Sequence, residues 1–233
     1  MGFPVNRMGG PSYQFMTALS LAEPFFMEAF SKMTVRPKRT KYNDILFRSR
    51  LEARWAVFMD LMGVRYKYEP FGAVVQTGVV EVGYLPDFEL PDIDLYVEIK
   101  ANATSEFVTD LAKIKAAAWT REVGEVVFLC GFPSRGGRKM YTPQHTELPY
   151  LSGETYNWEE CPRCCDVQIT NGCLPLCGCY TSEEDEAMFE GKIPDVDFKK
   201  TPRLMKAYRI AGQYNFTNNS QRVNMLPCQP LLI

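Results

Sequence analysis

The chain has 233 residues, a formal net charge of −2, and a composition that is 46% hydrophobic and 23% charged. This length suits one sizeable domain with an insertion, or two small domains, and the composition is typical of a globular protein. No run approaches the roughly 18 apolar residues of a membrane helix, and no apolar N-terminal segment resembles a signal peptide, so we expect an intracellular (cytoplasmic) protein with no membrane contact. The slightly acidic balance excludes nucleic-acid binding through overall charge, so such binding would need a local basic face.

Residues 1–41 are expected to form an N-terminal arm that is partly helical and ends in a basic stretch at residues 36–41. Two interpretations of the basic stretch stay open. It is either a solubilising hinge or an arm that contacts phosphate groups.

Residues 42–133 carry the patterns of an α/β core. Apolar residues recur at three- and four-residue steps over 42–62, which predicts a helix that Gly63 terminates. The next patterns predict a strand at 65–69, a hairpin and strand over 73–90 with a turn at Thr77-Gly78, a strand at 94–100, a helix at 104–121 and a strand at 125–131. We therefore expect a mixed central sheet flanked by helices.

The stretch 93–100 alternates strictly between apolar and polar residues. Because successive side chains of a strand point to opposite faces, Glu98 and Lys100 should project from one face while the apolar row anchors in the core. A carboxylate and an ammonium held together on a strand suit metal-assisted chemistry on a phosphate. The structural alternative is a solvated face or a cross-strand ion pair.

Two further acids accompany this strand. Asp87 follows Pro86 at the end of the preceding apolar run, and Glu52 lies on the predicted upstream helix. Glu52 also has a structural interpretation as an exposed partner of Arg48, four residues earlier on the helix.

Pro86-Asp87, Glu98-Ile99-Lys100 and the helical Glu52 together resemble the PD-(D/E)xK nuclease superfamily, and the resemblance covers roughly residues 42–132. It implies a restriction-endonuclease-like core of the order αβββαβ. It also implies that Asp87, Glu98 and the Ile99 carbonyl hold Mg²⁺ or Mn²⁺ at a catalytic site. Glu52 would orient water or help to bind a second ion, and Lys100 would polarise the attacking water or contact the scissile phosphate.

Six of the eight cysteines lie between residues 161 and 179. Two short knuckles of this kind suit tetrahedral zinc, which could supply roughly 10–16 kcal/mol of apparent binding energy to a segment too small to bury its own core. Cys161 and Cys164 open the set and Cys177 continues it, while the fourth ligand is Cys179 or Cys173, of which Cys179 is preferred. We expect Cys165 to be spare, and Cys130 and Cys228 to be a core residue and a tail residue. The segment 134–182 is thus predicted to be a zinc-ribbon insertion, followed by a helical C-terminal tail at 183–233.

The function expected from these features is metal-dependent hydrolysis of DNA phosphodiester bonds, with endonuclease action as the expected mode. The alternative is a non-catalytic nucleic-acid-binding or assembly protein that keeps the nuclease fold. DNA is the expected partner, a homodimer is a possible assembly, and stand-alone nucleases of this kind are often found on phages and other mobile elements. The zinc ribbon would either bind DNA or act only as a structural staple.

Overall fold

The computed structural model describes residues 37–78, 80–101, 110–133, 140–141, 157–170, 177–192, 197–217, 220–228 and 230. Nearly all of them belong to one compact unit, Lys38–Ile233. The predicted N-terminal arm lies almost entirely outside the described residues. Within the described part of the chain, no helix combines the length and the apolar character needed to cross a membrane.

A five-stranded sheet forms the centre of this unit, with the strand order β3-β6-β7-β8-β9. Its strands are β3 (Lys67–Tyr68), β6 (Phe88–Leu90), β7 (Leu95–Lys100), β8 (Val126–Cys130) and β9 (Met140–Tyr141). The sheet is mixed, because β7 pairs antiparallel with β6 and parallel with β8. Helix α3 (Asp110–Glu122) lies between the two parallel strands in the sequence, as a parallel connection requires. The prediction of a mixed α/β fold is confirmed.

The predicted helix at 42–62 is wrong in its first third. Strands β1 (Thr40–Tyr42) and β2 (Ile45–Phe47) form a hairpin there, and helix α2 (Arg50–Met62) begins only afterwards. The hairpin turns at Asn43 and Asp44, which both have positive φ, a conformation that these two residue types tolerate better than most. The predicted end of the helix is confirmed, since Gly63 takes the left-handed conformation with a φ of 74°.

Helix α2 is the most deeply buried helix of the described chain, with every residue from 55 to 62 buried. It packs against α5 (Pro202–Gln213), where the rings of Phe58 and Tyr208 stack with their centroids 4.7 Å apart. The ring of Trp158 lies 5.4 Å from that of Phe58 and comes from β10 (Asn157–Glu160), which pairs with β11 (Val167–Thr170). The cysteine-rich segment therefore contributes a side chain to the main core.

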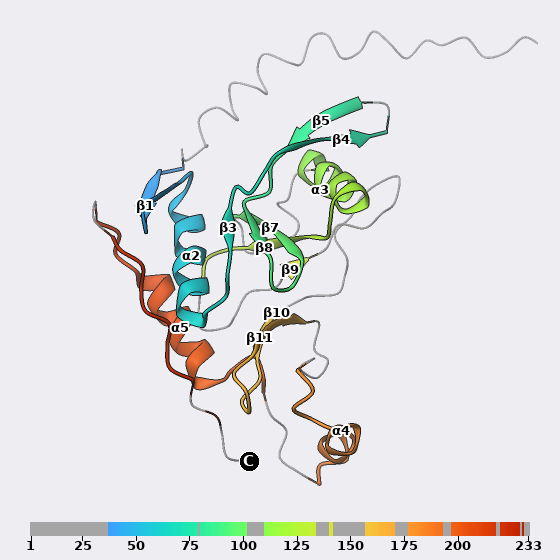
Figure 1. Cartoon of the computed structure of the whole chain (residues 1–233), viewed down its shortest axis with the longest axis vertical. Helices are drawn as coiled ribbons and strands as arrows, with labels where there is room; N and C mark the ends of the chain where they lie inside the picture. The colour runs from blue at the N-terminus through green and yellow to red at the C-terminus, as the bar shows by residue number, and fades with distance from the viewer. Residues whose placement is uncertain are drawn as a thin grey trace, which may run out of the picture. The chain divides into compact units, whose positions relative to one another are not determined.

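The hairpin predicted to turn at Thr77-Gly78 is present. Strands β4 (Ala73–Thr77) and β5 (Val80–Tyr84) pair from Thr77↔Val80 onwards and form a sheet of their own that packs on α3. Trp119 of α3 anchors this second core, with its ring 5.4 Å from that of Tyr84. In Figure 1 the two strands lie along α3.

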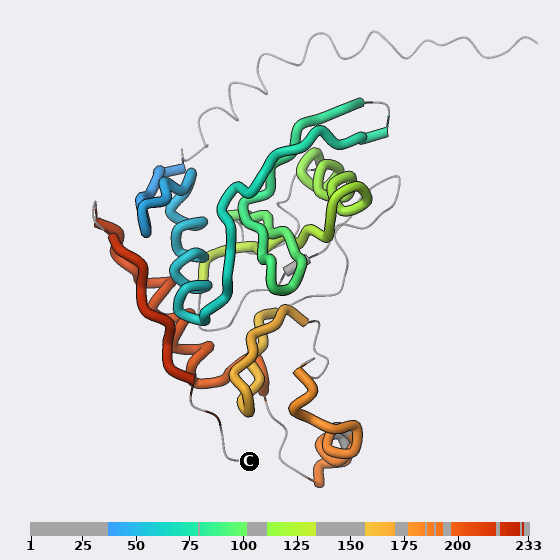
Figure 2. The backbone as a smooth tube through the Cα atoms, in the orientation of Figure 1, coloured from blue at the N-terminus to red at the C-terminus, as the bar shows by residue number. Residues whose placement is uncertain are grey.

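The C-terminal segment 220–228 runs back along α2 and β1 (Figure 2). The Leu226 N–H donates to the Leu61 carbonyl at 2.8 Å, and the Val223 N–H donates to the Tyr42 hydroxyl at 3.0 Å. A disulfide joins Cys228 to Cys165, whose Cα atoms are 5.8 Å apart. Cys165 is outside the group of four cysteines, as expected of a spare, and Cys228 lies in the tail, but neither is a lone cysteine because each is the other's disulfide partner.

Arg203, on α5, connects these separate parts. Its guanidinium forms an ion pair with buried Glu160 at 2.8 Å. It also donates to three backbone carbonyls, at the end of α2 (Met62, 2.6 Å), in the first cysteine knuckle (Cys165, 3.1 Å) and in the C-terminal segment (Leu226, 3.1 Å). One side chain thus satisfies acceptors from four segments.

We expect Arg203→Met to lower the free energy of unfolding by about 3–5 kcal/mol, because among the described residues it leaves the buried Glu160 carboxylate with the Thr201 hydroxyl as its one remaining side-chain partner. Denaturant titration measures the change. Arg209→Met is the matched control, because Arg209 is exposed on the same helix and its loss should cost less than about 0.5 kcal/mol. Equal effects of the two substitutions would contradict the role assigned to Arg203.

Candidate functional site

The sheet brings two of the predicted site strands together. In the β6–β7 register Phe88 lies opposite Val97, so Asp87 lies directly beside the stretch that carries Glu98. The Asp87 Oδ2 atom accepts the Ile99 N–H at 2.7 Å, which fixes the carboxylate against β7. The predicted alternation of β7 is confirmed, because Leu95, Val97 and Ile99 are buried and the residues between them are partly exposed.

Glu98 and Lys100 form an ion pair on the partly exposed face of β7. The Lys100 Nζ atom lies 2.6 Å from Glu98 Oε1, and the Tyr84 hydroxyl donates to Glu98 Oε2 at 3.2 Å. The ammonium also lies 5.9 Å from the ring centroid of Phe128, and the Lys100 side chain is only 28% exposed. The ion pair between Lys100 and Glu98 fits the structural interpretation of these two residues. It fits the functional interpretation equally well, because it places a cation beside a carboxylate that faces Asp87.

Glu52 lies in the first turn of α2 and is buried. Its carboxylate accepts from the Ser49 hydroxyl at 2.6 Å, from the Tyr68 hydroxyl at 2.6 Å and from the Arg48 backbone N–H at 3.1 Å. The expected ion pair between the side chains of Glu52 and Arg48 is replaced by this backbone contact, because Arg48 precedes the helix and does not lie on its face.

Arg48 is a member of the site that the sequence reasoning assigned only as a helix partner. Its Nη2 atom lies 2.5 Å from Asp87 Oδ1, and its Nε atom lies 2.6 Å from Glu69 Oε1. The only sequence signal was its position two residues before the first turn of α2, the turn that carries Glu52.

The carboxyl of Asp87 has an unusually high pKa, about 8. Burial is the largest cause, followed by the charges of Glu98 and then Glu52, while the Ile99 N–H and Arg48 oppose the shift. Asp87 is therefore close enough to Glu98 and to Glu52 for the charge of each to act on it, an arrangement that a bound cation would stabilise.

Hard carboxylate oxygens of this kind fit Mg²⁺ or Mn²⁺, with Asp87 and Glu98 as the candidate ligands. Within the described residues, however, the acids do not form a group of three with ligand atoms within 4.8 Å of one another, as the cysteines do. Glu52 is thus better placed to interact with the other two acids through charge than to share one ion with them. The ligand role predicted for the Ile99 carbonyl stays a prediction.

A cavity of about 770 Å³ lies elsewhere, lined by the end of α2, β11, the disulfide and the first cysteine knuckle. None of Glu52, Asp87, Glu98 and Lys100 lines it. We therefore do not assign the acids to that cavity.

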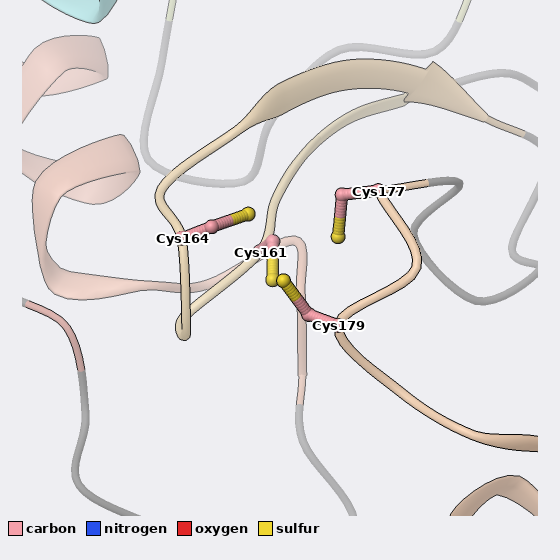
Figure 3. A group of neighbouring side chains, drawn as sticks. All are labelled: Cys161, Cys164, Cys177 and Cys179. Carbon is pink, nitrogen blue, oxygen red and sulfur yellow. The ribbon is translucent and has the colours of Figure 1, made fainter.

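The second candidate site is formed by Cys161, Cys164, Cys177 and Cys179, whose sulfur atoms all lie within 4.8 Å of one another (Figure 3). Four thiolates around zinc, with Zn–S bonds of about 2.3 Å, require sulfur separations of roughly 3.8 Å, so the group fits the ion. These four cysteines could hold a metal such as zinc. They include the preferred fourth ligand, Cys179, whereas Cys173 lies outside the described residues.

The backbone of each knuckle is shaped for convergence of its two sulfurs. The Cys165 N–H donates to the Cys161 carbonyl at 2.7 Å, which closes the first turn. In the second, Gly178 has a φ of 71° between the two cysteines.

The crowded thiols perturb one another. Burial and the neighbouring thiols raise the pKa of Cys177 to about 12. The pKa of Cys164 is lowered overall. Burial raises it, but hydrogen bonds from the Asp166 N–H and the other thiols lower it by more.

Arg163 joins the two knuckles. Its guanidinium donates to the Cys179 carbonyl at 2.5 Å and forms a bidentate pair with Glu184 on α4 (Ser182–Phe189) at 2.7 and 3.1 Å. It also lies 4.2 Å from the ring centroid of Tyr180. Arg163, followed by the Thr181 N–H, lowers the pKa of Glu184 to about 2, so the pair stays charged at physiological pH.

A comparison of the chain with protein-family models, with curated proteins and with solved structures found no significant match.

We expect Asp87→Asn to change the pH dependence of stability in the presence of EDTA. A folded-state pKa of about 8 lies above the unfolded value of about 3.9, so the folded protein holds an extra proton in this range and loses stability as the pH rises from 4 to 8. From pH 5 to pH 8 the variant should gain more than about 1.4 kcal/mol relative to wild type, the equivalent of one pKa unit.

Thermal and denaturant unfolding at the two pH values measure this gain. Asp92→Asn is the control, because Asp92 is an exposed acid paired with Arg65 and has a lowered pKa. Its removal should give a pH profile parallel to that of wild type. A parallel profile for Asp87→Asn as well would show that the three acids do not repel one another as inferred.

We expect about one tightly bound zinc ion per chain, lost in Cys161→Ser. Cys165→Ser is the matched control in the same knuckle, because Cys165 belongs to the disulfide and not to the group of four. The control should keep its zinc while losing about 2–4 kcal/mol of stability under non-reducing conditions. Elemental analysis and denaturant unfolding measure the two effects, and loss of zinc in both variants would contradict the ligand assignment.

Proposed function

We propose that the chain is a metal-dependent nuclease of the PD-(D/E)xK type that hydrolyses DNA phosphodiester bonds, with endonuclease action as its mode. The observation that carries the proposal is the interaction of three acids from separate elements. Asp87, directly before β6, is close enough to Glu98 on β7 and to Glu52 on α2 that both raise its pKa. The order of these elements, helix, strands, helix and strand, also supports a restriction-endonuclease-like core.

Asp87 and Glu98 would hold Mg²⁺ or Mn²⁺, which would supply charge neutralisation at the phosphate and lower the pKa of water. Glu52, held by Ser49 and Tyr68, would accept a hydrogen bond from the attacking water and orient it. Lys100 would donate from Nζ to the scissile phosphate or to that water, turning away from Glu98 when substrate binds. The cysteine group would hold a structural zinc.

The rival function is a non-catalytic nucleic-acid-binding or assembly protein with the same fold. The Glu98–Lys100 ion pair is the observation that favours it, because a pair at 2.6 Å needs no substrate to explain its presence. The two functions differ in what happens when Lys100 is removed from a protein that still folds and binds DNA.

We expect Lys100→Ala to cleave DNA about 10²–10³ times more slowly than wild type with Mg²⁺ or Mn²⁺, while DNA binding changes little, because an interaction made mainly in the transition state is lost. Lys67→Ala is the matched control, because Lys67 lies in the same sheet and forms an ion pair with Glu89 at 2.7 Å. The control should cleave at the wild-type rate.

Nicking of supercoiled plasmid and cleavage of linear duplex and single strands measure the rates, and anisotropy of a labelled strand measures binding. Equal rates for Lys100→Ala and Lys67→Ala would remove Lys100 from the mechanism. A wild-type protein that cuts none of these substrates would favour the rival function.

A further inference from the structure

We propose that Arg48 binds a phosphate group of the substrate, and that it does so only after it has left Asp87 to a divalent cation. The inference deepens the proposed function and rests on it for the identity of the metal and of the substrate. Metal and nucleic acid then bind cooperatively, because the guanidinium becomes available to phosphate only when the metal binds.

Each candidate metal ligand already faces a side-chain cation. The Arg48 Nη2 atom lies 2.5 Å from Asp87 Oδ1, and the Lys100 Nζ atom lies 2.6 Å from Glu98 Oε1. The other oxygen of Asp87 is turned towards the backbone, where it accepts the Ile99 N–H at 2.7 Å. Oδ1 is therefore the oxygen left for an ion, and a divalent cation that binds there repels the guanidinium of Arg48.

The Arg48 side chain can leave Asp87 without loss of the surrounding structure. The Arg48 backbone N–H donates to the Tyr68 hydroxyl at 2.9 Å and to the Glu52 carboxylate at 3.1 Å, and these bonds do not involve the guanidinium. The side chain of Arg48 is 49% exposed, whereas that of Asp87 is 6% exposed. The guanidinium thus borders the solvent from which a substrate arrives.

Glu69 supplies a pivot for this movement. Its Oε1 atom lies 2.6 Å from the Nε atom of Arg48, the guanidinium nitrogen nearest to the main chain. Once Asp87 is occupied by a metal, this contact can persist while the two outer nitrogens face another anion. Phosphate suits them, because the planar guanidinium can donate two parallel hydrogen bonds to its oxygens.

The backbone at Glu69 is shaped to hold this carboxylate beside Asp87. Glu69 has a φ of 45°, which is uncommon for a glutamate, and its N–H donates to the Asp87 carbonyl at 2.9 Å. The β3–β6 register pairs Tyr68 with Phe88, so Glu69 continues the pairing beside Asp87. Such strained residues cluster at functional sites, and here the strain brings a second acid to the same arginine.

The charges around the site explain why the two binding events should be linked. Without a metal, Glu52, Glu69, Asp87 and Glu98 repel a phosphate, and Arg48 is held by two of them. A divalent cation offsets the negative charge and displaces the guanidinium in the same step. The displaced arginine then needs an anionic partner, and the phosphate of the substrate is the anion that the proposed function brings to the metal.

The first measurement is calorimetric binding of Mg²⁺ without nucleic acid at pH 9, where protons compete little for the carboxylates. For Arg48→Gln we expect binding about tenfold tighter or more, because a cation that repels the ion has been removed. Arg65→Gln is the matched control, because it removes the same charge from an exposed arginine that pairs with Asp92. The control should bind Mg²⁺ as wild type does.

The second measurement is salt-dependent binding of a short fluorescein-labelled DNA duplex, followed by anisotropy. All proteins carry Lys100→Ala to slow cleavage, and a gel verifies that the duplex stays intact. With Mg²⁺, adding Arg48→Gln should make the slope of log K against log [NaCl] shallower by nearly 1, since one phosphate contact contributes about 0.9. In EDTA the slopes with and without Arg48→Gln should coincide, because Asp87 then holds the guanidinium.

Two further variants test whether the effect belongs to the charge at this position. Arg48→Lys should restore most of the slope with Mg²⁺, because a lysine can still contact phosphate. Arg65→Gln should leave the slope unchanged both with Mg²⁺ and in EDTA.

The inference is overturned if Arg48→Gln reduces the slope equally in EDTA and with Mg²⁺, or matches Arg65→Gln with Mg²⁺, even if wild type cleaves DNA and the proposed function stands. Unchanged or weaker Mg²⁺ binding by Arg48→Gln overturns it as well. If both measurements give the expected results and wild type cuts nothing, the role of Arg48 stands and the nuclease proposal fails. A wild-type protein that binds no Mg²⁺ overturns both.

Discussion

The buried guanidinium of Arg203 is the interaction on which the arrangement of the described chain depends. Its partners come from segments that are distant in the sequence: the end of α2, the first cysteine knuckle, β10 and the C-terminal segment. A buried carboxylate such as Glu160 is costly unless it is paired and hydrogen-bonded, so these segments are held in one relative position. Lysine could not substitute, because only the planar guanidinium reaches several acceptors at fixed angles.

A second electrostatic constraint acts at the other side of the main core. Asp87 is buried beside two other acids, and Arg48 and the Ile99 N–H offset only part of the resulting repulsion. A purely structural ion pair gives no reason to bury Asp87 and Glu52 close together and beside the partly exposed Glu98. The same crowding follows directly if a divalent cation belongs at the site, since the acids that repel one another in its absence are those that bind it. Arg48 supplies a local counter-ion for Asp87, with its Nη2 atom 2.5 Å from Asp87 Oδ1.

Much of this could be predicted from local sequence patterns, and the misses have physical reasons. The alternation of β7, the turn at Thr77-Gly78 and the stop at Gly63 are local signals, and the structure confirms all three. The hairpin before α2 was missed because its apolar residues happen to continue the helical spacing, whereas the turn depends on Asn43 and Asp44 adopting positive φ.

The contacts that escaped prediction are long-range in sequence. The pairing of Arg48 with Asp87 spans 39 residues, and the disulfide between Cys165 and Cys228 spans 63. The periodicity of apolar residues in the sequence predicts neither contact. The four cysteines were predictable for the opposite reason, because zinc ligands come as short paired knuckles whose spacing is visible in the sequence. The disulfide partner of the spare Cys165 was not predictable, since it depends on where the C-terminal segment returns.

The same long-range contacts decide between the two roles open to the cysteine-rich segment. A ribbon that binds DNA independently would share little of its surface with the core. Here Trp158 of β10 is buried against Phe58 of α2, and Glu160 of the same strand is held by Arg203. The bidentate pair between Arg163 and Glu184 then ties both knuckles to α4. A metal held by the four cysteines would therefore stabilise a segment that is packed on the main core, which favours the role of a structural staple.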